Sequence, residues 1–65
     1  MRELNEIKGI IGKLTDKQFE RINEADGAAY FGTTATERKN GRRRLVRNLK
    51  AIGLTVDEWN TWAAE

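Results

Sequence analysis

Residues 34–53 read TATERKNGRRRLVRNLKAIG and contain signals for both ends of one helix. Thr34 followed by Glu37 has the spacing of a capping box, in which the threonine oxygen accepts an amide hydrogen of the first turn and the glutamate reaches back to the cap amide. Gly53 predicts the end, because glycine adopts the left-handed conformation after a helix without steric cost. We therefore expect a helix over residues 35–52.

The same signals recur along the rest of the chain. Capping-box spacing is found again at Thr15 with Gln18 and at Thr55 with Glu58, and Gly32 is expected to end a helix in the left-handed conformation. These signals predict three further helices, over residues 2–13, 16–31 and 56–64. Apolar residues recur at helical spacing in the segments, namely Leu4, Ile7, Ile11 and Leu14 in the first and Leu45, Leu49 and Ile52 in the third.

The predicted fold class is all-α, a small three- to four-helix orthogonal bundle forming a single domain over residues 1–65. The segment from 16 to 52 also invites comparison with a helix-turn-helix, because Ala28 is a small residue four positions before Gly32. The later positions fit that motif less well, since the residues six and nine after this glycine are Arg38 and Gly41 rather than apolar.

Gly41 leaves two alternatives for the third segment. Asn40-Gly41 is a strong hairpin signal, so residues 30–46 could form a two-stranded ribbon, although residues 36–44 lack the apolar alternation of a strand. A break at Gly41, with a turn over 35–40 and a helix over 42–52, is favoured over the ribbon. Glycine inside a helix costs about 1 kcal/mol relative to alanine, which is the reason for considering either alternative.

The composition excludes several classes of protein. The chain has 65 residues with no Cys and no His, so neither a disulfide framework nor a zinc site is expected. Because Ser is absent too, the usual activated nucleophiles and the usual general base are missing, and we expect no enzyme activity and no cofactor. No stretch resembles a signal peptide or a membrane span, so a cytoplasmic protein that makes no contact with membranes is expected.

The positive charge is concentrated in one short stretch. Residues 37–50 contain seven basic side chains and one acidic side chain, whereas the whole chain has a net charge of only +2. At about 100° per residue, Leu45 and Leu49 define one side of the third helix and most of the cations fall on the opposite side. Arg42 falls at about 60° from Leu45, at the border of the buried stripe, and is the poorer candidate for contacting a ligand. The predicted contact residues are Lys39, Arg43, Arg44, Arg47 and Lys50.

This basic face predicts binding to nucleic acid, with DNA favoured over RNA, by a small accessory or regulatory protein, for example in transcription regulation. Exposed cations are common on helices, but no acidic residue follows Glu37 on this helix to offset the repulsion. The alternative is that the charge of this face is neutralised by acidic residues of the second and fourth helices, or by an acidic protein partner.

Two tryptophans close together support a second hypothesis, a protein-interaction module or homodimer with no nucleic-acid role. Trp59 and Trp62 lie three positions apart on the last helix and could form an exposed anchor, since Trp is enriched at interfaces. Packing in the core is favoured for the pair, and a third arrangement has Trp59 buried and Trp62 at the rim.

Acidic residues at four-residue spacing on the second helix could dock the basic face of another molecule. They are Asp16, Glu20 and Glu24.

Overall fold

The computed structural model describes residues 2–65, and within them it contains four helices and no strand. The helices are α1 (Leu4–Gly12), α2 (Asp16–Phe31), α3 (Ala35–Ala51) and α4 (Val56–Ala63). They pack as a small bundle, which confirms the predicted all-α fold class. The bounds of α2 agree with the prediction, the other three helices each end one residue earlier than expected, and α1 also begins two residues later.

Threonine caps begin three of the helices, as the spacing predicted. The capping boxes of Thr15 and Thr55 are complete, with the threonine hydroxyl accepting from the backbone of Gln18 or Glu58 and the side chain of that residue accepting from the cap amide. The box at Thr34 is only half formed. Its hydroxyl accepts from the Glu37 amide at 3.1 Å, but the Glu37 carboxylate accepts from the amide of Thr33 at 2.8 Å.

The two predicted glycine stops differ in geometry. Gly53 has a φ of 83°, and the amide of Leu54 donates to the carbonyl of Leu49 at 2.9 Å, so the left-handed end of α3 is confirmed. Gly32 has a φ of −57° and a ψ of 142°, so the prediction of a left-handed residue there was wrong. Glycine is required at this position for space, since a Cβ atom would lie 2.6 Å from the carbonyl oxygen of Ala28.

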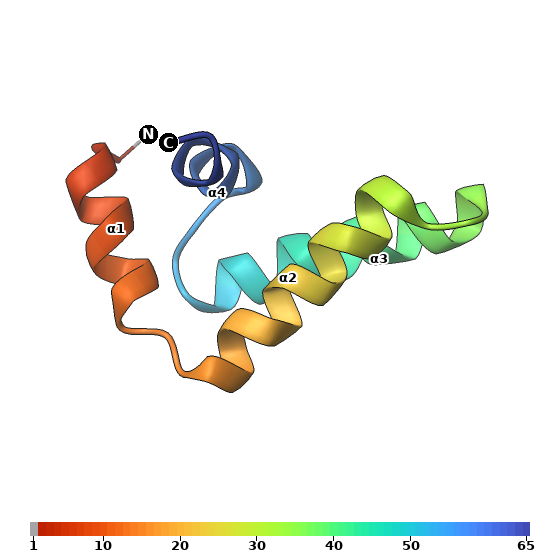
Figure 1. Ribbon diagram of the computed structural model, residues 1–65, viewed down its shortest axis with the longest axis horizontal. Coiled ribbons are helices and arrows are strands. Elements are labelled where there is room, and N and C mark those ends of the chain that lie inside the picture. The colour runs from red at the N-terminus through yellow and green to blue at the C-terminus, as the bar shows by residue number, and fades with distance from the viewer. Residues whose placement is uncertain (1) are drawn as a thin grey trace.

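The two longest helices, α2 and α3, lie antiparallel and side by side as a hairpin that extends beyond the rest of the molecule (Figure 1). They do not cross as the two helices of a helix-turn-helix do. Both alternatives for the third segment were wrong, because α3 runs through Gly41 without a break or a ribbon. The reason is packing: Gly41 is buried, and a Cβ atom there would lie within 2.7 Å of Ala28 and Ala29.

The core lies at the base of the hairpin, where α1 and α4 cover it (Figure 1). In this view α4 is seen nearly end-on, whereas α1 beside it runs down the picture, so these two helices lie across one another. Buried apolar side chains from all four helices and the loop before α4 form the core. They are Ile7, Ile11, Ile22, Ala25, Leu45, Leu49, Leu54 and Trp59.

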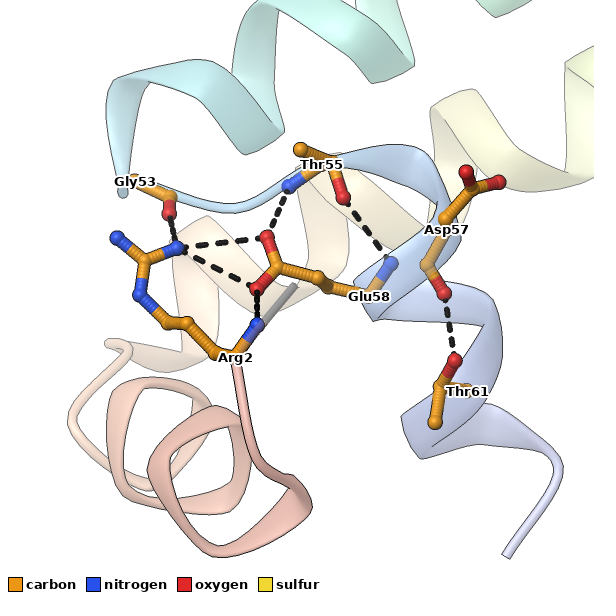
Figure 2. Close-up of polar contacts among 6 residues, drawn as sticks. All are labelled: Arg2, Gly53, Thr55, Asp57, Glu58 and Thr61. Atoms are coloured by element: carbon orange, nitrogen blue, oxygen red, sulfur yellow. Dashed lines mark hydrogen bonds and ion pairs between the residues drawn. The ribbon is translucent and has the colours of Figure 1, made fainter.

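A buried carboxylate joins the beginning of the chain to α4 (Figure 2). Glu58 is 2% exposed and accepts hydrogen bonds from the backbone amides of Thr55 at 3.0 Å and Arg2 at 3.1 Å. The Arg2 guanidinium lies 3.3 Å from the same carboxylate and also donates to the Gly53 carbonyl. These contacts lower the pKa of Glu58, the backbone amide of Thr55 contributing most, against the opposing effect of burial.

Candidate functional site

All seven cations of α3 are exposed. The buried positions of this helix, Gly41, Leu45 and Leu49, recur at four-residue spacing and face the core and α2. Because these positions take up one side of the helix, the charged side chains are directed to the other side and its flanks. The cations are Arg38, Lys39, Arg42, Arg43, Arg44, Arg47 and Lys50.

Six of the side chains of α3 line one open groove on its outer side, which we call the basic groove. Five of them are cations and the sixth is Val46, which is 46% exposed. The set is Lys39, Arg42, Arg43, Val46, Arg47 and Lys50. At about 1.5 Å per residue, the groove follows the helix for about 16 Å. Its cations therefore form a row along an elongated surface with an apolar side chain in the middle.

The structure brings together four of the five residues that the sequence predicted as contacts. Lys39, Arg43, Arg47 and Lys50 share the basic groove. Arg44 does not, because it lines a separate hollow with Ala28, Glu37 and Asn40 on another side of the hairpin.

Sequence reasoning missed Arg42, which is exposed and lines the basic groove. The helical projection took Leu45, Leu49 and Ile52 as the buried side, which placed Arg42 at its border. In the structure, the buried side also includes Gly41, which lies against Ala28 and Ala29 of α2. This contact moves the centre of the buried side away from Arg42.

Among residues 2–65, no carboxylate oxygen lies within 4.0 Å of a cationic nitrogen of α3. Within residues 2–65, the ion pair of Arg2 with Glu58 is the only one that brings a cationic nitrogen within 4.0 Å of a carboxylate oxygen. Acidic residues of α2 and α4 therefore do not neutralise the basic groove by direct contact. Lys39, Arg43 and Arg47 stand at four-residue spacing, where like charges destabilise a helix by a few tenths of a kcal/mol per pair.

The two tryptophans pack against each other, with ring centroids 5.1 Å apart, but differ in burial, as the third arrangement anticipated. Trp59 is 2% exposed and belongs to the core, whereas Trp62 is partly buried and packs against the core from its edge. Phe19 of α2 lies against both, with ring centroids 5.8 Å from Trp59 and 5.9 Å from Trp62. Trp59 is thus not accessible as an anchor, and only Trp62 presents any surface.

Other kinds of site have little support in the part of the chain that the structure describes. No three acidic side chains there are placed so that they could hold a metal ion. None of α1 to α4 is long and apolar enough to cross a membrane. Comparisons with protein-family models, with curated proteins and with solved structures gave no match to this chain.

Proposed function

We propose that this protein binds nucleic acid, with DNA favoured over RNA, through the basic groove of α3, and acts as an accessory or regulatory protein. The observation that carries this proposal is the row of five exposed cations without a carboxylate partner among residues 2–65. A polyanion would neutralise this row and release its own condensed counterions, which favours association.

The residue types of the groove suit a phosphate backbone. Arg43, Arg47 and Arg42 can each donate two parallel hydrogen bonds to a phosphate, and Lys39 and Lys50 add point charges at the two ends of the row. An α-helix is about 10–12 Å wide, which matches the major groove of B-form DNA at about 12 Å. The deep and narrow major groove of A-form RNA does not admit side chains in this way, which is why DNA is favoured.

Val46 gives the groove a contact that charge alone does not provide. Its side chain lies among the cations and is nearly half exposed. An apolar side chain in the major groove can contact the methyl group of thymine. Phosphate contacts would therefore position α3, and Val46 would add an apolar contact to a base edge.

A titration of labelled duplex DNA, followed by fluorescence anisotropy at several salt concentrations, tests the proposal. Binding through four to five phosphate contacts gives a plot of log affinity against log salt with a slope of about −4. The double variant Arg43→Ala with Arg47→Ala should bind more weakly and reduce the steepness of that slope by about 2.

The matched control is the double variant Lys8→Ala with Lys17→Ala. It removes the same charge from exposed positions of α1 and α2, away from the basic groove. This control should keep the slope of the parent. Equal weakening by both double variants would mean that only net charge matters, and unchanged binding by the Arg43 and Arg47 variant would exclude α3 as the contact surface.

Self-association, or docking of an acidic protein, is the second candidate function. The observation in its favour is the exposed acidic line of α2, Asp16, Glu20 and Glu24, which has the same four-residue spacing as Lys39, Arg43 and Arg47. One copy could therefore place its α2 along the α3 of another. Light scattering separates the two candidates: a concentration-dependent dimer without salt-sensitive DNA binding favours self-association.

A further inference from the structure

The tip of the α2–α3 hairpin carries an aromatic ring that the fold does not use. Phe31 is the last residue of α2, and its side chain is 88% exposed, whereas the other phenylalanine, Phe19, packs against both tryptophans. A single exposed apolar residue needs no explanation by itself. Phe31 differs from such a residue because it lies on a hydrogen-bonded turn and close to the cations of α3.

Several hydrogen bonds connect the residues of the tip. The Gly32 amide donates to the Ala28 carbonyl at 3.1 Å, and the Arg38 guanidinium donates to the Gly32 carbonyl at 2.9 Å. The Thr33 amide donates to the Glu37 carboxylate at 2.8 Å. Because a Cβ atom on Gly32 would also meet Arg38 at 3.1 Å, the turn is closely packed. The backbone that carries Phe31 is thus tied to the turn by these hydrogen bonds, which reduces the backbone entropy that is lost when the ring is bound.

The tip also adjoins the beginning of the basic groove. The hairpin projects away from α1 and α4 (Figure 1), and α3 starts at Ala35, directly after the tip. Lys39, the first groove residue, is only eight positions from Phe31 in the sequence and lies in the second turn of α3. A strand that follows the basic groove toward the tip therefore comes close to the end of α2 that carries Phe31.

We propose that Phe31 stacks on an unpaired nucleobase of the nucleic acid that the basic groove holds by its phosphates. This inference rests on the proposed function and adds a ligand class to it, namely a single-stranded or locally opened segment. Every base has a π-face, so a phenyl ring next to a row of cations suits such a segment whatever its sequence. An exposed apolar side chain can also enter between neighbouring bases.

A mutant cycle that removes either the ring or the base tests this inference. The probes are a labelled single strand of mixed sequence and a strand of the same length and charge in which several central positions are abasic. The parent should bind the strand with bases about tenfold more tightly than the abasic strand. Phe31→Ala should lose this preference, and its slope of log affinity against log salt should remain that of the parent, since stacking neutralises no phosphate.

Two further variants separate stacking from a general apolar contact. Phe31→Trp keeps an aromatic face and should retain the preference for the strand with bases. Phe31→Leu keeps an apolar side chain without a π-face and should lose most of it. All three substitutions are at an exposed position, so circular dichroism should show the helix content and melting temperature of the parent.

The possible failures are distinct from one another. If Phe31→Ala discriminates between the two strands as the parent does, the stacking role is wrong while the proposed function stands. If the parent binds neither the single strands nor duplex DNA, the proposed function is wrong, and the stacking role that rests on it is wrong too. If Phe31→Ala abolishes self-association seen by light scattering and leaves strand preference unchanged, Phe31 is a contact between copies of the chain and the stacking role is overturned.

Discussion

A Cβ atom placed on Gly41 of α3 would lie 2.7 Å from the Cβ atom of Ala28 on α2. The two helices thus approach each other more closely than any residue with a side chain at position 41 would allow. This contact also determines the rotation of α3 about its own axis, because Gly41 must face α2. Since side chains follow at about 100° per residue, the same rotation places the basic groove on the outer side of the helix.

Gly41→Ala should therefore destabilise the protein, although alanine has the higher helix propensity. The added methyl group would lie 2.6 Å from the backbone nitrogen of Ala29, so the helices must move apart. Overpacking of this kind typically costs about 1–3 kcal/mol, against about 1 kcal/mol gained from propensity. We expect a melting temperature below that of the parent when unfolding is followed by circular dichroism.

The matched control for this variant is Gly27→Ala, in the interior of α2. A Cβ atom there has no neighbour within 4 Å, so only the propensity changes. Stability should rise by about 1 kcal/mol, which is a shift of about 4–8 °C in a domain of this size. A Gly41→Ala protein as stable as Gly27→Ala would show that α2 and α3 do not pack as closely as described.

Glu58 should make the stability of the protein depend on pH in the acid range. Its pKa in the folded state is lowered from 4.5, chiefly by the amide of Thr55, and further by the amide and guanidinium of Arg2. A carboxylate with a lowered pKa stabilises the folded state above its unfolded pKa, and this contribution is lost as the pH falls through the folded pKa. The melting temperature should therefore decrease as the pH falls below about 4.5.

Glu58→Gln isolates this contribution. The glutamine side chain has the same size, but its NH2 group cannot accept a hydrogen bond from the backbone amide, of Arg2 or of Thr55, that it then faces. The melting temperature of the variant should therefore be below that of the parent at pH 7. The difference between the two proteins should shrink as the pH falls toward the folded pKa, where Glu58 itself becomes protonated. Glu24→Gln, at an exposed position of α2, is the control. A difference that stays constant with pH would contradict the role given to the charge.

Much of the fold could be predicted from local signals in the sequence. Caps, apolar spacing and Gly53 depend on interactions within a few residues, and they gave all four helices within about two residues at each end. What failed depends on contacts between helices. The conformation of Gly32 was predicted wrongly, because a Cβ atom there would meet Ala28 and Arg38. The antiparallel hairpin, and the contact of Gly41 with Ala28 that explains why α3 runs unbroken as predicted, depend on the packing of α3 against α2. No local pattern contains that information.

The same distinction applies to the candidate site. Helical periodicity was sufficient to group Lys39, Arg43 and Arg47 on one face, because they are four residues apart. It ranked Arg44 above Arg42, whereas in the structure Arg42 lines the basic groove and Arg44 lines a separate hollow, because the outer side of α3 depends on where α2 contacts it. The difference between these two arginines is therefore a finding of the structure, and it can be measured.

Arg42→Ala and Arg44→Ala remove the same charge from exposed positions two residues apart on α3. If nucleic acid lies along the basic groove, Arg42 contacts it and Arg44, in the hollow with Glu37 and Asn40, does not. Arg42→Ala should lower the affinity for duplex DNA and reduce the steepness of the salt dependence by about 1. Arg44→Ala should leave that slope unchanged and affect affinity only through the long-range field, an effect that salt near 0.15 M largely screens. If instead Arg44→Ala flattened the slope and Arg42→Ala did not, the contact surface would be the side of the hairpin that carries Ala28 and not the outer side of α3.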